Sequence, residues 1–134
     1  MDLMLPRRIP KEPKRESRWR SPAHTTFVRG FACAMCGSTT NIEAAHVRMG
    51  SGAGMGQKPD DWRTVPLCGG GGCHSTQHTV GEPVFWKEYH KNHGQGVEQL
   101  IAELIKASPK RREIETIRST RGPGLANNRP GQGS

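Results

Sequence analysis

The sequence is short of the residues from which a large core is built. Only 32% of its 134 residues are hydrophobic and 5% are aromatic, whereas it contains 17 glycines and 10 prolines. A core of this size supplies little stability, and small domains of this kind usually rely on disulfides or a bound metal as well. We therefore expect a single domain that is held together partly by its four cysteines.

Membrane and secretion signals are also missing. No apolar run approaches the roughly 20 residues of a membrane-spanning helix. The N-terminus has an acid at position 2, and few apolar residues precede its first proline and two arginines. We expect a soluble protein of a reducing compartment with no membrane partner. In such a compartment, paired cysteines bind metal more often than they form disulfides.

Acidic residues are scarce at both ends of the chain. Residues 1–20 hold seven Lys and Arg against three Asp and Glu, residues 109–134 hold six against two, and residues 21–108 hold seven of each. The net charge of +8 therefore lies in the two terminal segments. This pattern is typical of a protein that binds a polyanion, most simply a nucleic acid, although solubilising tails would give the same charge.

Composition and periodicity divide the chain into four segments. We expect a basic flexible arm over 1–23, partly anchored by Trp19, a metal-containing domain over 24–95, a packing helix over 96–108 and a basic, mostly disordered tail over 109–134.

Shorter patterns predict the elements within these segments. The residues from Phe27 to Phe31 suggest short β segments, Ile42 to Val47 reads as a strand, and a Gly-rich loop follows before the chain returns over 64–68. Helices are predicted over four stretches: residues 73–78, 82–93, the amphipathic 97–105 and a short basic stretch from Pro109.

The four cysteines form two pairs with the spacing of metal ligands. Two residues separate Cys33 from Cys36, and four separate Cys68 from Cys73. Each pair can present two thiolates from one turn, and two such turns complete the tetrahedral sulfur shell of a structural Zn²⁺ site. Because a spacing of four is less common, His74 is an alternative to Cys73 as the fourth ligand.

Three histidines are free for a second role if zinc takes the cysteines. His74 and His78 lie four residues apart, so on a helix both imidazoles share one face and can bind a single ion. Otherwise His78 is a surface residue, and His46, on the predicted strand, is a packed one. A strand, a Gly-rich loop and a helix that begins at a zinc cysteine would assemble a ββα unit with His46 opposite His74 and His78.

These motifs together resemble the HNH, or ββα-metal, endonuclease superfamily. Its pattern is matched by the first cysteine pair, by the strand "AAHV" with His46 and by "PLCGGGGCH" with His74. The stretches "AHVRMGSGAGMGQKPDDWRTVPLC" and "GEPVFW" are similar to a phage- and prophage-associated branch that includes the phage recombination-enhancing nuclease. The resemblance covers residues 24–90. It implies a small α+β fold in which a four-cysteine zinc site holds a ββα-metal unit together. C-terminal helices follow this unit, and the basic arms are disordered.

The resemblance also implies an activity. It indicates a metal-dependent endonuclease that hydrolyses DNA phosphodiester bonds with little sequence specificity, in phage or prophage recombination or DNA processing, in the cytoplasm of a bacterial host cell. His46 would take a proton from water, and His74 and His78 would bind a catalytic divalent metal, Mg²⁺, Mn²⁺ or another first-row ion. Ala45 stands where many HNH enzymes have an Asp ligand, so Glu43 is a third, less favoured contributor.

The Gly-rich loop would then lie over the edge of the active site. Arg48, Lys58 and Arg63 are expected to contact DNA phosphates, while Asp60 and Asp61 orient one of these cations or a histidine. Taken singly, each of these charges is more often a solvated loop residue than a DNA contact. The arms could also bind a recombination protein.

A zinc-containing module that binds nucleic acid without cutting it is the alternative. It explains the cysteines and the basic ends, but it gives no reason for His46, His74 and His78 to occur together. A nucleobase deaminase needs H-x-E, whereas "VRM" follows His46, and a thiol-redox enzyme needs a βαβ setting that is not predicted. The form of DNA or RNA bound and the oligomeric state stay open.

Overall fold

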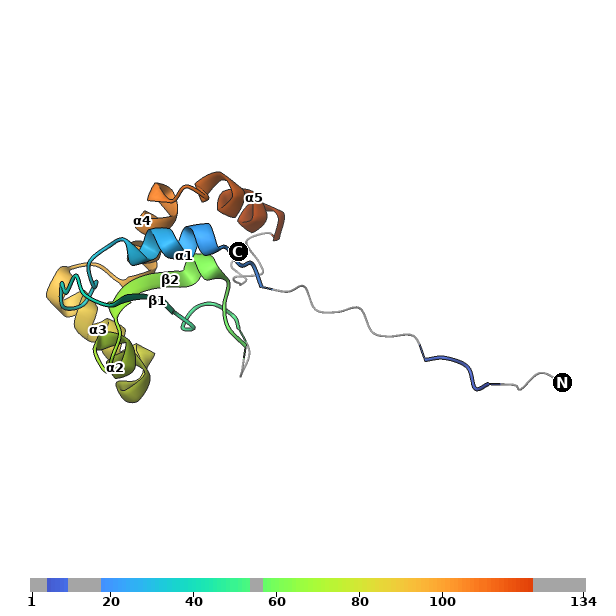
Figure 1. Ribbon diagram of the computed structural model, residues 1–134, viewed down its shortest axis with the longest axis horizontal. Coiled ribbons are helices and arrows are strands. Elements are labelled where there is room, and N and C mark those ends of the chain that lie inside the picture. The colour runs from blue at the N-terminus through green and yellow to red at the C-terminus, as the bar shows by residue number, and fades with distance from the viewer. Residues whose placement is uncertain (1–4, 10–17, 54–56, 122–134) are drawn as a thin grey trace.

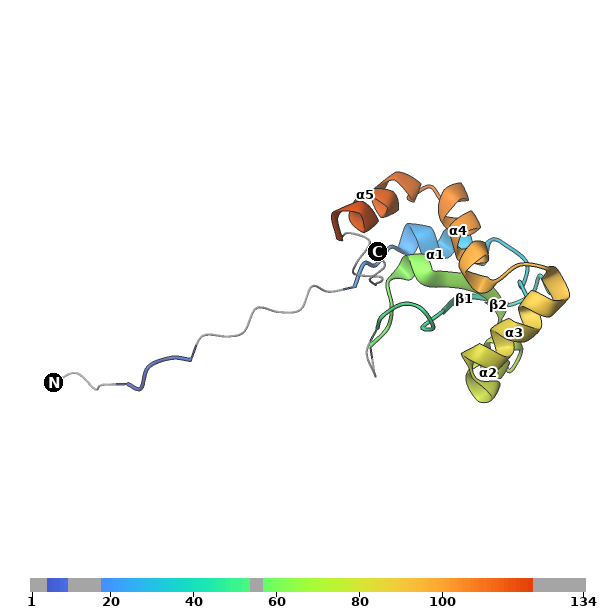
Figure 2. The same cartoon turned by 180° about the vertical axis from the view of Figure 1, so that it is seen from behind.

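A computed structural model describes residues 5–9, 18–53 and 57–121, which form a small α+β fold. Residues 1–4 and 10–17 of the arm predicted over 1–23, and residues 122–134 of the tail predicted over 109–134, lie outside the described residues. The elements of the described residues are α1 (Pro22–Arg29), β1 (Ile42–His46), a 3₁₀ helix (Asp61–Arg63), β2 (Thr64–Cys68), α2 (Cys73–Val80), α3 (Glu82–His93), α4 (Val97–Ala107) and α5 (Arg111–Arg121). Figures 1 and 2 show the two strands between two groups of helices, α1, α4 and α5 above and α2 and α3 below.

The two strands form an antiparallel sheet with a regular register. Ile42 lies opposite Cys68, and His46 lies opposite Thr64. Directly opposite residues share a face, and successive residues alternate between faces. One face therefore carries Ile42, Ala44 and His46 from β1, and the other face carries Glu43 and Ala45.

The core is built from this sheet and from the helices α3 and α4. Ala45, Val65 and Leu67 are completely buried. The aromatic residues of α3 pack edge to face, with ring centroids 4.9 Å apart for Phe85 and Trp86. The amphipathic helix predicted over 97–105 is α4, and its apolar stripe is buried at Val97, Ile101, Leu104 and Ile105.

Helix α1 occupies a stretch for which the sequence suggested short β segments, and that prediction was wrong. The Ser21 side chain accepts a hydrogen bond from the backbone N–H of His24 (3.1 Å), and Pro22 stands in the first turn. Both features favour a helix start and outweigh the β propensity of the Thr, Phe and Val residues that follow. His24 and Val28 are fully buried, and His24 Nδ1 lies 2.7 Å from Ser108 Oγ. The cap thus starts the helix, and the contact between His24 and Ser108 places α1 against the junction of α4 and α5.

The other predicted helices occur close to their expected bounds. The helix from Cys73 extends two residues further than predicted, to Val80. Helix α3 ends at His93, and the φ of Gly94, which follows it, is 73°, in the left-handed region. Helix α5 begins at Arg111, not at Pro109. Among the described residues, no helix has both the length and the apolar composition to cross a membrane.

Candidate metal centres and the histidines of the hairpin

The four cysteines meet where the hairpin joins α2. The Sγ atoms of Cys33, Cys36, Cys68 and Cys73 all lie within 4.8 Å of one another, and those of Cys36 and Cys68 are 3.7 Å apart. Four Zn–S bonds of about 2.3 Å in a tetrahedron separate the sulfurs by roughly 3.8 Å. The residues therefore fit a structural metal such as zinc, and Cys73 belongs to the cluster that the sequence predicted.

The glycine run lets the second cysteine pair close on itself. A side chain at Gly72 would place its Cβ 2.6 Å from Cys68 Sγ, and Gly71 has a φ of 84°. Only glycine fits both demands at low cost. The closed turn brings the backbone N–H of Cys73 to 3.2 Å from Cys68 Sγ. The run is thus a structural requirement of the cluster.

The thiols of the cluster differ in acidity. Burial opposes ionisation of Cys33, but hydrogen bonds from the backbone N–H groups of Cys36, Cys68 and Met35 outweigh it and lower its pKa to about 7. Burial and the neighbouring thiols raise the pKa of Cys73. Several crowded thiolates are therefore unfavourable without a cation, which is the charge that a bound metal supplies.

A second polar set lies on α2, directly after the last cysteine. His74 Nδ1 is 2.6 Å from Glu43 Oε1 on β1, and the rings of His74 and His78 have centroids 5.0 Å apart. The helical spacing of four thus brings the two imidazoles side by side, as predicted. Among the described residues, only the cysteines converge closely enough to form a group of three or more metal ligands.

His46, at the end of β1, pairs with a carboxylate. His46 Nε2 lies 3.0 Å from Asp61 Oδ1, and Asp61 also accepts hydrogen bonds from Arg18 Nη1 (2.7 Å) and from the backbone N–H of Ser21 (2.9 Å). Burial opposes ionisation of Asp61, but these donors outweigh it and hold its pKa below the ordinary 3.8. The imidazole therefore faces an ionised carboxylate that is fixed from two other directions.

The two histidine sets lie on different faces of the hairpin. Strand alternation puts His46 and Glu43 on opposite faces of β1, whereas the sequence predicted His46 opposite His74 and His78. The structure joins His74 with His78 and Glu43, and it joins His46 with Asp61. The catalytic and metal-binding roles of these residues stay predictions.

The three cations predicted to contact DNA have different surroundings. Arg63 is bound to Glu98 at 2.6 Å, to Met49 O at 2.7 Å and to Val47 O at 3.2 Å, and its side chain is 12% exposed. A DNA contact of Arg63 would have to break this ion pair. Arg48 and Lys58 are exposed, so they meet the first requirement for a phosphate contact.

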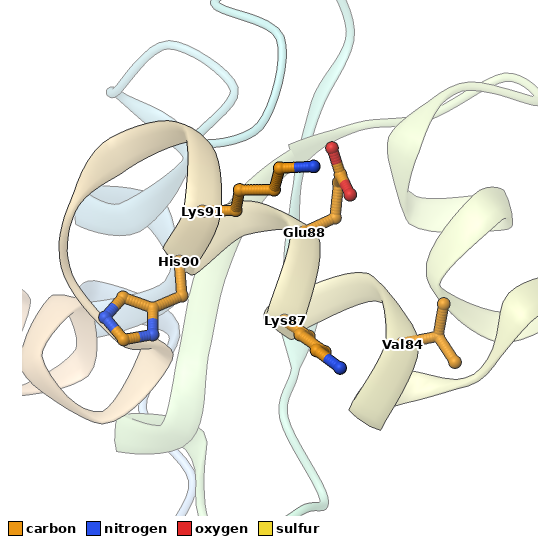
Figure 3. A pocket seen from close by; sticks show the side chains of 5 residues that line it. All are labelled: Val84, Lys87, Glu88, His90 and Lys91. Carbon is orange, nitrogen blue, oxygen red and sulfur yellow. The ribbon is translucent and has the colours of Figure 1, made fainter.

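A separate pocket lies on α3, and none of the predicted site residues lines it. It is lined by Val84, Lys87, Glu88, His90 and Lys91. Figure 3 shows these side chains pointing in different directions around the helix. A ligand site usually has several polar groups that converge on one point, so this pocket is no part of the candidate site.

Sequence reasoning missed Arg18 and Ser21, which hold Asp61 from 43 and 40 positions away in the chain. The pair Ser21–Pro22 is a recognisable helix start. It could have signalled α1, but nothing in the local sequence marks Asp61 as a partner.

Residues 3–109 match the model of a family described as "Protein of unknown function (DUF968)". The match spans the cysteine cluster, both histidine sets and all of the structure from α1 to α4. No curated protein and no solved structure matches the chain.

Proposed function

We propose that the chain, which belongs to the DUF968 family, is a metal-dependent endonuclease of the HNH type that hydrolyses DNA phosphodiester bonds with little sequence specificity. One observation carries the proposal: an antiparallel hairpin is followed directly by α2, the cysteine cluster joins the two, and both carry histidines. Such hydrolysis needs a base that activates water and a cation that stabilises charge on the phosphate oxygens.

His46 is the candidate base. A neutral imidazole has one N–H and one lone pair. The ionised carboxylate of Asp61, 3.0 Å from Nε2, favours the tautomer with the proton on Nε2. The lone pair then lies on Nδ1, which takes the proton from the attacking water. Asp61 also stabilises the imidazolium that this transfer produces.

His74 and His78 are the residues that would hold the catalytic metal. A bound divalent ion supplies the positive charge that stabilises the scissile phosphate. The hydrogen bond from Nδ1 of His74 to Glu43 leaves Nε2 as the ligand atom, which is the usual arrangement of metal-binding histidines. Imidazole ligands favour first-row ions such as Mn²⁺ or Ni²⁺ over Mg²⁺.

The scissile phosphate has to lie within reach of both His46 and the metal held by His74 and His78. We propose that it lies at the edge of β1. In the two-stranded sheet of the described residues, β1 has a partner strand on one side only. A nucleic-acid strand that lies along this edge passes between the two faces. The distance from Glu43 to His46 along the strand is about 10 Å, so a phosphate at the edge between them is within reach of side chains from both positions.

Nicking of a supercoiled plasmid tests the proposal. We expect wild type to nick in the presence of Mg²⁺, Mn²⁺ or Ni²⁺, and His46→Ala and His74→Ala to be about 100-fold slower or worse at matched zinc content. His90→Ala is the matched control, because this histidine is exposed on α3 and outside the site. Equal nicking by all four proteins would overturn the assigned roles.

The second candidate is a non-catalytic zinc module that binds nucleic acid. One observation favours it: among the described residues, the cysteines form the only close group of three or more metal ligands. Glu43 and His74 would then be an ordinary surface ion pair. This candidate predicts that no variant cuts DNA in any of the three ions, while all of them retard it in a gel.

A further inference from the structure

Residues 18–121, without the undescribed 54–56, form the folded body of the protein. The two ends of this body meet at one carboxylate, that of Asp60. Its Oδ1 accepts a hydrogen bond from the backbone N–H of Trp19 (2.6 Å), and its Oδ2 accepts one from Nη1 of Arg121 (2.8 Å). Trp19 precedes α1, and Arg121 is the last residue of α5. One side chain thus holds both ends of the body.

Further contacts support this meeting point. Trp19 Nε1 donates a hydrogen bond to Glu113 Oε2 of α5 (2.8 Å), and the rings of Trp19 and Trp62 lie 5.5 Å apart. The Arg121 guanidinium lies over the Trp62 ring at 5.2 Å. Both views of the molecule show the end of α5 beside the segment that enters α1 (Figures 1 and 2). We call these five residues the Asp60 corner: Trp19, Asp60, Trp62, Glu113 and Arg121.

The corner itself has one basic and two acidic side chains, but it joins two segments, residues 18–20 and 109–121, that each have an excess of positive charge. The excess of Lys and Arg over Asp and Glu lies in residues 1–20 and 109–134, and the corner brings the inner parts of these segments together. Arg20 on one side and Arg118 on the other are exposed, and neither has an acidic partner among the described residues. Asp61, next in the chain, holds His46. The two cationic ends therefore adjoin the candidate base.

We infer that the Asp60 corner makes the described inner parts of the two basic segments, residues 18–20 with Arg20 and residues 111–121 with Arg118, bind one and the same DNA backbone beside His46. A duplex held by one end lies at high local concentration for the other end, so the second contact costs little additional entropy. This inference rests on the proposed function for the identity of its partner. It goes further by assigning the place and the manner in which the DNA is held.

Asp60→Asn in the full chain tests whether DNA binding depends on the contacts of the Asp60 corner or only on net charge. The variant loses a negative charge, which by itself would strengthen DNA binding. Loss of the ion pair with Arg121 releases α5 from the corner, so we expect affinity for a duplex of one helical turn to fall about tenfold. Glu103→Gln, on the exposed side of α4, removes the same charge elsewhere, and we expect equal or tighter binding. Tighter binding by both variants would overturn the inference.

Arg20→Gln and Arg118→Gln provide a second measurement, which leaves the corner contacts in place. Each variant should weaken binding to the one-turn duplex and reduce the dependence of log K on log salt by about one unit. If only one of them matters on this short duplex, the two ends bind at different places and the inference fails.

These measurements are independent of cleavage. A chain that binds through both arginines without nicking plasmid keeps the inference and loses the nuclease proposal. A chain that nicks plasmid while both arginine variants bind like wild type loses the inference alone.

Discussion

The two faces of the hairpin hold their histidines in different ways. On one face, His46 pairs with Asp61, whose side chain is 11% exposed and accepts two further hydrogen bonds. On the other face, His74 pairs with Glu43, whose side chain is 47% exposed. A buried, multiply bonded carboxylate is costly to disturb, whereas an exposed ion pair contributes little to stability. One face is built for a fixed geometry, and the other can exchange partners.

The cysteine cluster supports both faces, so its loss should have the largest effect. Cys68 ends β2, and Cys73 begins α2. We expect Cys68→Ala to abolish tight zinc binding and to lower the free energy of unfolding by about 3 kcal/mol or more, because metal binding is coupled to folding. Zinc content per chain and thermal unfolding measure both effects.

Ser75→Ala is the control for this variant, because Ser75 is exposed on α2 and outside the cluster. If Cys68→Ala retains one zinc per chain and unfolds at the temperature of wild type, the cluster does not support the hairpin.

The parts of the fold that local spacing determines could be predicted from the sequence. The cysteine pairs, the His74 and His78 spacing on α2 and the apolar stripe of α4 are set by neighbours within a few positions. Helix α1 was not predicted, because its β-prone residues Phe27 and Val28 suggested strands, whereas the helix begins at the Ser21 cap. Propensity is a weak signal when a cap and tertiary burial oppose it.

The partners of Asp61 could not be predicted in the same way. Ser21 and Arg18 are 40 and 43 positions away, and they reach Asp61 only because α1 packs on the hairpin. The sequence shows that Asp61 is a charged loop residue, but its burial results from tertiary packing. The separation of His46 from His74 follows from two facts: Glu43 and His46 lie on opposite faces of β1, and His74 pairs with Glu43. The alternation is local, but the pairing of Glu43 with His74 is a tertiary contact.

Asp61→Asn tests the stability of the face that carries His46 and Asp61. The amide keeps the shape of the carboxylate but loses the charge that pairs with Arg18, so a partly buried guanidinium is left uncompensated. We expect the free energy of unfolding at pH 7 to fall by about 2 kcal/mol. Urea unfolding of the zinc-loaded protein measures it, with Glu103→Gln as a charge-matched control.

Acid should produce the same loss in wild type. The folded pKa of Asp61 is below its ordinary 3.8, so its stabilisation is complete above the unfolded pKa and disappears as the pH falls through the folded value. Between pH 5 and pH 3, wild type should therefore lose more stability than Asp61→Asn. Parallel losses would mean that another carboxylate dominates the acid response.

Glu43→Gln should have the smallest effect on stability, because its ion pair with His74 is half exposed. We expect a change within about 0.5 kcal/mol in the same urea experiment. Affinity for Mn²⁺, measured by calorimetry on zinc-loaded protein, should nevertheless fall about 10-fold or more, because Glu43 orients His74 through Nδ1. A variant that loses little stability but much of its metal binding would show that the face of Glu43 and His74 serves metal binding, whereas the face of Asp61 serves stability. If Glu43→Gln instead destabilises the chain as much as Asp61→Asn while Mn²⁺ binding is unchanged, Glu43 is a structural residue and the two faces differ only in exposure.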